Sequence, residues 1–464
     1  MSDYKVTIGL EIHVALKTKS KLFSRSACDF ELDKFSYFDA GIPGMLPVLS
    51  EEPVKMALKF ATAVKSNIPD ISIFERKHYF YPDLSLGYQI TQQHNPIMIG
   101  GIVPIEVDGK SINVQIEHAH LECDAAKSLH DKVSGYTAID LSRGSSPLLE
   151  IVSTPCLHSP KEAKIYAQTV CDIVKYLDIC DGKLEEGSFR VDASISLSKT
   201  EKLGTRVEIK NISSFGYLET ALNYEIERQT ELLDSGIPVD METRLFDEKT
   251  SSTMSMRKKE TVHEYRYMPD PDIPPLVLNQ DLKKSIIEDS FIYYFEIKNK
   301  LENIFEKLDI KVESTAQLLT SKYKEIWKAL LSDNELQSES FIKMLAYWIP
   351  EVHSKSGIEE KLSFEDILKF YKSGLQAKEM KEAMIKYITS DLDIESCIPK
   401  MMNNSELEDI IKNVLSEYPT QIKEFKEGNE KLLQFIIGKS MAAVKGKAPA
   451  TLVKDIVIQL IKDF

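Results

Sequence analysis

The chain has 464 residues, 43% apolar and 28% charged, a balance typical of a globular protein with roughly two to four domains. Its 58 Lys and Arg against 72 Asp and Glu give a net charge of −14, which argues against a protein that coats nucleic acid along its whole surface. No apolar run reaches the ~18 residues of a membrane helix, the first residues lack the layout of a signal peptide, and the six cysteines form no CxxC pair, so we expect neither membrane association nor a structural zinc.

The first predicted element is a strand over residues 5–16. Apolar side chains occupy every second position, and Glu11 and His13 lie between them on the opposite face. A carboxylate and an imidazole two residues apart on a strand point the same way and can ligate a divalent cation. For this pair alone, an exposed polar face is the commoner explanation.

A second polar segment runs from His118 to Asp124. If it is extended, His118, His120, Glu122 and Asp124 share one face and Cys123 points away. The histidines and the cysteine suggest zinc, but no fourth soft ligand is near in the sequence, and the oxygen ligands suit Mg²⁺ better.

One carboxylate lies inside an apolar run. Glu150 is the charged residue of the segment 147–152. If its side chain is buried, it needs a partner or a metal. A register in which it faces solvent is equally compatible with the sequence.

A helix and two charged segments follow. Ser159 and Glu162 form a capping box with proline between them, which predicts a helix that Asp181 and Gly182 end. Strands are predicted at 190–197 and 206–210, and both signs of charge alternate along 183–192 and 206–211. Such side chains can face a cleft that binds a polyphosphate with Mg²⁺, or they can form ion pairs on a wet sheet. Strands with interspersed helices predict an α+β domain with a mainly antiparallel sheet.

The remainder of the chain has the pattern of amphipathic helices. Helix starts are predicted at Ser363 and Ser405, each with an acidic residue three positions on, and Gly374 ends one helix. We place domain boundaries near 293 and 403, which gives domains 1–293, 294–403 and 404–464. Residues 431–464 hold six lysines against two aspartates, a composition that suits a polyanion or a solvated helix face. The run at 438–440 mimics the end of a P-loop without its first glycine, so we expect no phosphate-binding loop.

Ordered motifs along nearly the whole chain resemble the B subunit of the tRNA-dependent aspartyl/glutamyl amidotransferases, the GatB family. The matching segments are IGLEIHVALKTKSKLFS (8–24), PGMLPVL (43–49), RKHYFYPDLSLGYQITQ (76–92), HLECDAAKSLH (120–130), PLLEIVS (147–153), KLEEGSFRVDASIS (183–196), GTRVEIKNISSF (204–215), ETRLFDE (242–248), YRYMPDPDIPPL (265–276) and FIIGKSMAAVKGKA (435–448).

This resemblance implies a fold and a reaction. The fold would be an N-terminal cradle similar to the glutamine synthetase catalytic domain, followed by a helical domain and a GatB/YqeY-type tail that binds tRNA. The cradle would use ATP and Mg²⁺, without zinc, to phosphorylate the side-chain carboxylate of Glu-tRNA(Gln) or Asp-tRNA(Asn). Ammonia from the amidase (glutaminase) subunit of a heterotrimer, whose third member is a small clamp subunit, would then form the amide. Such an enzyme is expected in the cytoplasm, without a membrane partner.

The resemblance also assigns roles to residues of this chain. The implied metal ligands are Glu11, His13, Glu122 and Glu150. The implied catalytic residues are Glu122, Glu150 and Asp192. The implied nucleotide and substrate contacts are Arg190, Glu208 and Lys210. The implied tRNA contacts are Lys439, Lys445 and Lys447.

Some positions depart from the family pattern. The pattern HLEED is HLECD here, with Cys123 in place of a glutamate expected on the metal or ammonia path, and PKGYQ is SLGYQ, with Leu86 in place of lysine. These departures leave open an alternative function: a subunit that binds tRNA and partners with weakened catalysis. A freestanding ligase for a small molecule would leave the helical tail without a role.

Overall fold

The computed structural model describes residues 4–463 with short gaps. The gaps are residues 29–34, 259–264, 288–292, 312–314, 321–323, 333–337, 357–361, 376, 399–401, 427–428, 430, 445–447 and 449. The chain forms two compact units, Met1–Asn299 with Leu319–Ser321, and Lys300–Leu318 with Lys322–Phe464. The predicted division into three domains stays a prediction.

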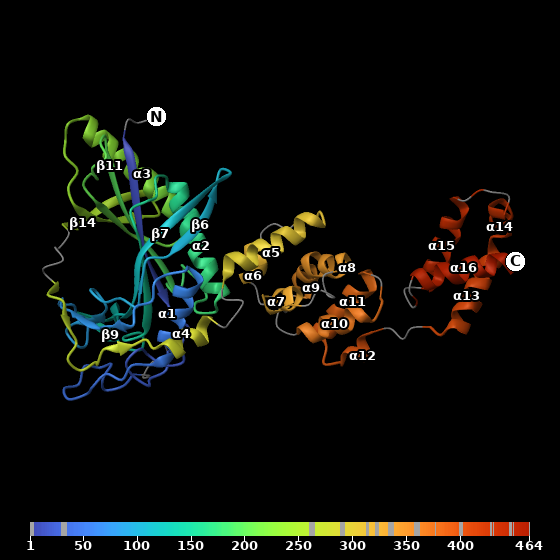
Figure 1. Cartoon of the computed structure of the whole chain (residues 1–464), viewed down its shortest axis with the longest axis horizontal. Helices are drawn as coiled ribbons and strands as arrows, with labels where there is room; N and C mark the ends of the chain where they lie inside the picture. The colour runs from blue at the N-terminus through green and yellow to red at the C-terminus, as the bar shows by residue number, and fades with distance from the viewer. Residues whose placement is uncertain are drawn as a thin grey trace. The chain divides into compact units, whose positions relative to one another are not determined.

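The first unit is built on a nine-stranded sheet with β1 (Lys5–Ala15) in its interior (Figure 1). The strand order is β14-β13-β12-β11-β1-β10-β7-β5, and β6 pairs with the first half of β7. The described pairings are antiparallel except for β12 with β13, so the predicted α+β class with a mainly antiparallel sheet is confirmed. The other strands are β5 (Met98–Ile99), β6 (Ile102–Val107), β7 (Lys110–Cys123), β10 (Pro147–Ser153), β11 (Phe189–Ser198), β12 (Val207–Ile212), β13 (Glu242–Asp247) and β14 (Ser252–Lys258).

Helices cover one face of this sheet. Helix α2 (Pro160–Tyr176) packs on β1 and β6, and α3 (Phe215–Asp234) packs on β11, β12 and β14 (Figure 1). The apolar side chains of β1 from Ile8 to Val14 are 0–2% exposed against these helices, and each contributes about 1.5–3 kcal/mol of burial. The alternate side chains of β1 therefore lie on the opposite face, which the helices leave free.

Ser159 caps the helix as predicted, because its hydroxyl accepts from the Glu162 amide, but the reciprocal bond of a capping box is not formed, since Glu162 Oε2 accepts from the His158 amide and not from that of Ser159. The helix ends at Tyr176, earlier than the predicted stop. Gly182 instead makes a turn with φ +71°, where a Cβ atom would come within 2.6 Å of Cys171 Sγ. Strand β11 begins at Phe189. The charged segment 183–188 before it is a turn, so its alternating charges do not lie along a strand face, contrary to the prediction.

Smaller sheets stand beside the free face. A three-stranded sheet, β15-β3-β4, brings together segments almost 200 residues apart in the sequence. Its strands and those of the two-stranded pairs are β2 (Ile71–Ser72), β3 (Glu75–Lys77), β4 (Gln89–Thr91), β8 (Lys127–Val133), β9 (Tyr136–Asp140), β15 (Met268–Pro269) and β16 (Leu276–Val277). Helices α1 (Glu51–Ala63) and α4 (Gln280–Ile287) pack on each other.

The second unit is helical. It begins within α5 (Tyr294–Lys307), which spans the boundary between the units. Its elements are α6 (Thr315–Thr320), α7 (Lys324–Ser332), α8 (Glu339–Lys343), the π-helix η3 (Met344–Trp348), α9 (Ile349–Ser356), α10 (Phe364–Lys372), α11 (Ala377–Thr389), α12 (Ile394–Cys397), α13 (Asn404–Glu417), α14 (Pro419–Lys426), α15 (Lys431–Val444) and α16 (Ala450–Asp463). No helix in the described ranges is long and apolar enough to cross a bilayer.

Two predicted helix starts have different outcomes. Ser363 and Asp366 form the predicted capping box of α10, and Gly374 follows that helix with φ +70°. The start predicted at Ser405 is wrong by two residues, because Asn403 caps α13 and its side chain accepts from the Glu406 amide. Helices α13 to α16 enclose an apolar core of their own, with Leu407, Ile436 and Val457 at 0% exposure.

Candidate functional site

The sheet pairing places polar side chains in a row across the free face. Strand β1 lies between β10 and β11, and His13 is opposite Glu150 on one side and Arg190 on the other. Glu150 is in turn opposite His120 on β7. The register therefore aligns Arg190, His13, Glu150 and His120 on four adjacent strands. The sequence left open whether Glu150 has partners or faces solvent. Its side chain lies on the free face, beside His13 and His120.

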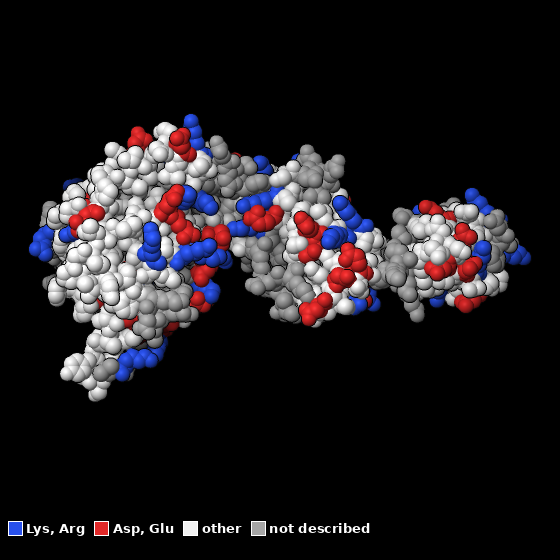
Figure 2. All heavy atoms as spheres, turned by 90° about the horizontal axis from the view of Figure 1, so that it is seen from below, with Lys and Arg blue, Asp and Glu red and all other residues white. Residues whose placement is uncertain are grey.

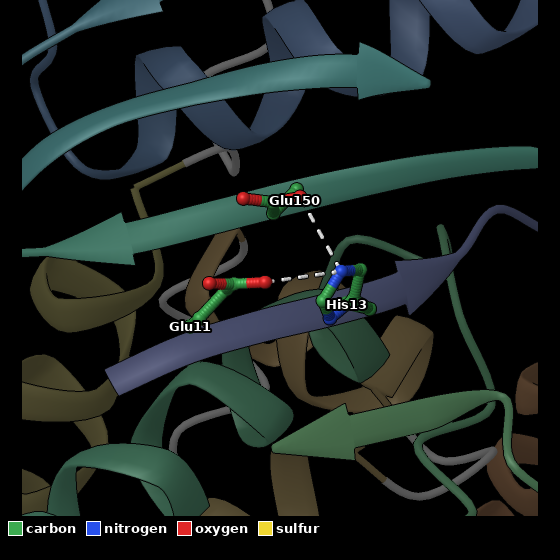
Figure 3. A group of neighbouring side chains, drawn as sticks. All are labelled: Glu11, His13 and Glu150. Atoms are coloured by element: carbon green, nitrogen blue, oxygen red, sulfur yellow. Dashed lines mark ion pairs between the residues drawn. The ribbon is translucent and has the colours of Figure 1, made fainter. Parts of the chain in front are cut away.

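Glu11, His13 and Glu150 form a compact triad (Figure 3). His13 Nε2 is 3.5 Å from Glu11 Oε1 and 3.3 Å from Glu150 Oε2. The three side chains point toward one another from β1 and β10. One nitrogen and two carboxylate oxygens within this space could bind one cation.

A second group shares a member with the first. His120 Nε2 lies 3.5 Å from Glu150 Oε2 and 3.7 Å from Glu122 Oε2. Glu122 also approaches His13, with its Oε1 3.6 Å from Nε2. Within the part of the chain that the structure describes, these two triads are the groups that could hold a metal, and Glu150 belongs to both.

The charges of the row perturb one another. Burial would lower the pKa of His13, but the hydrogen bond to Glu150 and the nearby carboxylates raise it to about 9. Burial and the repulsion of Glu150 raise the pKa of Glu11 to about 7. Burial opposes ionisation of Glu150, yet His120 and His13 hold the pKa of its carboxyl well below its usual range. The protonated imidazoles thus balance the negative charge of the neighbouring carboxylates. A hard divalent cation could balance the same charge, so the donor set fits Mg²⁺.

Beside Glu11, a second polar group occupies the free face of β11, β12 and β13. Lys210 Nζ is 2.5 Å from Asp192 Oδ2 and 3.6 Å from Glu208 Oε1. Thr243 donates from its hydroxyl to Glu208 Oε2 at 2.9 Å. Asp192, Glu208 and Lys210, all predicted from the sequence, are therefore neighbours. Arg190 instead approaches Asp124 on the other side of the row, with its Nη2 3.2 Å from Asp124 Oδ1.

Several residues of the site were not selected from the sequence. Lys77 lies over Tyr79 and Tyr265, at 5.6 and 5.1 Å from the ring centres, and Glu122 and Glu150 raise its pKa although burial opposes this. Arg143 binds Asp124 at 2.6 Å. Both arrive from loops or short strands distant in sequence, and no periodic pattern marks them. His120 lies in the polar segment 118–124 that the sequence indicates, but it is not among the predicted metal ligands.

Two cavities lie on the free face, one on each side of the row along the strand direction. The Arg206 cavity, about 290 Å³, adjoins Glu11 and has a floor of small residues that includes Gly9 and Ser194. The Arg143 cavity, about 320 Å³, begins beyond His13 and Glu122, at Ala15 and Asp124. The two triads thus stand between the cavities.

The predicted tRNA contacts are described only in part. Lys439 on α15 has its Nζ 5.5 Å from the ring centre of Phe435 and 5.9 Å from that of Tyr418. Lys445 and Lys447 lie outside the described residues. On the face shown in Figure 2, acidic and basic side chains of α13–α16 are interspersed and form no single basic patch.

Comparisons with known proteins agree along the chain. Residues 6–284 match the family described as the GatB/GatE catalytic domain, and residues 353–461 match the GatB domain. The B subunit of the aspartyl/glutamyl-tRNA(Asn/Gln) amidotransferase of Legionella pneumophila (strain Philadelphia 1) is 39% identical, with 96% of this chain and 97% of that protein covered. The proteins of the same name from Nitrosococcus oceani and Francisella tularensis are 40% and 36% identical, over 96% and 98% of this chain and 97% and 98% of theirs.

Proposed function

The chain belongs to the GatB family of amidotransferase B subunits, and from that premise we propose that it performs the amidation step on Glu-tRNA(Gln), Asp-tRNA(Asn) or both. The observation that carries the proposal is the convergence of Glu11, His13, Glu122 and Glu150 in one space. The alternative of a subunit with weakened catalysis has no support in this geometry, because the whole donor set is present despite Cys123.

The reaction needs activation of a carboxylate, which is a poor acyl electrophile. An oxygen of the substrate side chain attacks the γ-phosphorus of ATP, the bond to ADP breaks, and an acyl phosphate forms. Ammonia then attacks the acyl carbon, loses a proton, and inorganic phosphate departs. Mg²⁺ held by the triads would neutralise charge on the transferring phosphoryl group.

The residues divide this work by position. Glu11, His13, Glu122 and Glu150 would hold the cation, and His120 would add a further ligand to the set. ATP occupies the Arg206 cavity, where the small floor residues Gly9 and Ser194 leave room for a base. Lys210 is fixed by Asp192 and Glu208 beside Glu11, and it orients the phosphates. Arg190, opposite His13 on β11 and 3.2 Å from Asp124, neutralises the substrate carboxylate.

The family name implies a multi-subunit enzyme, and we extend this to specific partners. A glutaminase subunit releases ammonia, and a small clamp subunit holds the two larger chains together in the cytoplasm. Residues 404–464 form a tRNA-binding domain in which Lys439, Lys445 and Lys447 contact phosphates. Mg²⁺ suits the site better than zinc, because three of its five donor side chains are carboxylates, the ligands that Mg²⁺ prefers.

The test is a reconstituted reaction. The chain is combined with the glutaminase and clamp subunits, Glu-tRNA(Gln), ATP, Mg²⁺ and glutamine. We expect Gln-tRNA(Gln), with one ADP released for each amide formed, and no product when EDTA removes the cation. Absence of Gln-tRNA(Gln) in this mixture, together with absence of Asn-tRNA(Asn) when Asp-tRNA(Asn) replaces Glu-tRNA(Gln), would overturn the proposal.

A further inference from the structure

A nucleotide in the Arg206 cavity must cross one step of the sheet to reach the triads. In the proposed function its base lies over Gly9 and Ser194, and its γ-phosphorus must meet the cation beside His13. Glu11 lies midway between Gly9 and His13 on β1, and two residues along a strand span about 7 Å. The triphosphate therefore passes over the part of the free face on which Glu11 lies.

The strand register shows which residues share that step. Glu11 is opposite Asp192 on β11 and Val152 on β10. Val152 is in turn opposite His118 on β7. Asp192 accepts a hydrogen bond from Lys210, and Val152 has no polar atom in its side chain. His118 is thus the member of this row whose side chain can donate a hydrogen bond to a phosphate.

A bulge in β7 determines where His118 lies. Val152 pairs with His118, whereas the next residue of β10 pairs with Ile116. Glu117 is therefore an extra residue in β7, and it lines the Arg206 cavity. His118 precedes His120 by two residues, and their rings stack with centres 5.5 Å apart and an angle of 20° between the planes. His118 consequently lies next to a cavity residue on β10 and next to a triad residue on its own strand.

The His118 imidazole is accessible and keeps a donor for a ligand. Its side chain is 21% exposed, and it forms no hydrogen bond within the described part of the chain. Glu117 Oε1 approaches its Nδ1 only to 3.8 Å. Burial and the charge of His120 lower the pKa of His118, but a neutral imidazole still carries one N–H group. A phosphate oxygen would accept from this group in a bond stronger than one between two neutral groups.

We propose that His118 donates a hydrogen bond to an oxygen of the β- or γ-phosphate of ATP and directs the triphosphate toward the triads. The inference rests on the proposed function and adds a nucleotide contact to it. His118 belongs to β7 and Lys210 to β12, so the two donors approach the phosphates from opposite sides of β1. AMP lacks both of these phosphates and cannot make the contact.

The experiment measures the equilibrium affinities of ATP and AMP for the reconstituted complex with Mg²⁺ and without tRNA, in two variants of opposite character. His118→Phe keeps a ring that can stack on His120 but has no donor, whereas His118→Gln keeps a donor and has no ring. We expect His118→Phe to weaken ATP binding by roughly ten- to a hundredfold, the range of a hydrogen bond to a charged group, with AMP binding unchanged. His118→Gln should retain most of the ATP affinity. His158→Ala is the control, because it removes an exposed imidazole whose Nδ1 is 2.9 Å from the Val6 carbonyl oxygen, and it should bind both nucleotides like wild type.

The two nucleotides separate a lost contact from a damaged fold, because misfolding lowers both affinities together. If His118→Phe binds ATP like wild type, or loses affinity for ATP and AMP equally, the inference is overturned. Loss of ATP affinity in His118→Gln but not in His118→Phe would show that the ring only supports His120, and it would overturn the inference as well.

The proposed function is tested separately, by formation of Gln-tRNA(Gln) or Asn-tRNA(Asn) in the wild-type complex. Absence of both products together with the expected nucleotide affinities would remove the function and leave the His118 contact in place. A wild-type complex that binds no ATP would overturn both.

Discussion

Glu150 determines the charge balance of the site, because it is the carboxylate that both triads share. We expect Glu150→Gln to lower tRNA-dependent phosphate release from ATP by at least roughly a hundredfold, since the proposed mechanism would lose a metal ligand and its charge together. Binding of misacylated tRNA should stay at the wild-type affinity in a filter assay. Glu106→Gln, on an exposed position of β6, is the control. Wild-type phosphate release by Glu150→Gln would contradict the assignment of this residue.

The protonation of the row predicts a pH dependence of stability without metal. The pKa of Glu11 is raised to about 7 and that of His13 to about 9, so the folded chain binds more protons than the unfolded chain between about pH 4.5 and 9. Stability therefore falls as pH rises through this range. We expect the free energy of unfolding in urea, measured in EDTA, to decline from pH 5 to 9, and saturating Mg²⁺ to reduce the slope. A flat profile in EDTA would contradict these shifts.

Cys123 and Leu86, the departures from the family pattern, line the same small cavity of about 20 Å³. Burial raises the pKa of Cys123 far above its ordinary value, so the thiol is neutral and unreactive. Cys123→Glu alone would bury a carboxylate between Glu122 and Asp124, and we expect a loss of about 2–4 kcal/mol in unfolding free energy. Adding Leu86→Lys should restore part of this stability by pairing the new charge. A double variant no more stable than Cys123→Glu would show that the two positions are not coupled.

The residues of the site differ in how visible they are in sequence. The alternation of β1 is enough to place Glu11 and His13 on one face, and the structure has them there. The face of Glu150 could not be predicted, because a strand of seven residues can pair in either register and only its neighbours β1 and β7 determine which. Lys77 and Arg143 approach through loops whose folding depends on the whole sheet, so no local pattern reveals them. The roles of these residues stay predictions.

At the scale of elements, an ionic network joins α3 to the edge of the sheet. Glu225 on α3 is 0% exposed and accepts from Arg228 at 2.9 Å and from the Thr253 hydroxyl at 2.5 Å, and Arg244 Nε lies 3.0 Å from it. Arg244 and Thr253 belong to β13 and β14. The network fixes β13, and β13 carries the Thr243 hydroxyl that holds Glu208.

Loss of this network should destabilise the fold. We expect Glu225→Gln to lower the free energy of unfolding by about 3 kcal/mol at pH 7, because buried arginines lose their counter-charge. Burial opposes ionisation of Glu225, but its bonds to Arg228 and Thr253 lower its pKa, so the wild-type advantage is present above about pH 4.5 and shrinks as pH falls further. Urea unfolding at pH 7 and pH 3.5 measures both values. Glu227→Gln on the exposed side of α3 should have almost no effect at either pH.

Element boundaries show where local rules suffice. The α10 capping box was predictable because Ser363 and Asp366 satisfy each other's backbone within four residues. The start of α13 was predicted two residues late, since Asn403 is as good a cap as Ser405 and the sequence does not rank them. The turn at 183–188 alternates charge like a strand but has no neighbouring strand to pair with.

At the scale of the whole molecule, an acidic chain must still bind a polyanion. We expect Lys439→Ala to raise KM for misacylated tRNA a few-fold with kcat and KM for ATP unchanged, because the proposed role of its ammonium is to contact a tRNA phosphate and not a reacting group. The slope of log affinity against log salt should fall by about one unit in magnitude. Lys412→Ala, on α13, is a control of equal charge change. An unchanged salt slope would remove Lys439 from the tRNA contact.

The pairing of β1 with β10 and β11 has a consequence for how this sequence can vary. The residues that face the helices and those on the free face alternate along a single strand, so an insertion or deletion of one residue in Lys5–Ala15 would exchange the two sets. Substitutions can be tolerated one at a time in such a strand, whereas length changes cannot. We therefore expect this segment to tolerate some substitutions but no change of length. In a deletion scan, loss of any one residue of Lys5–Ala15 should abolish function, including residues whose side chains can be substituted.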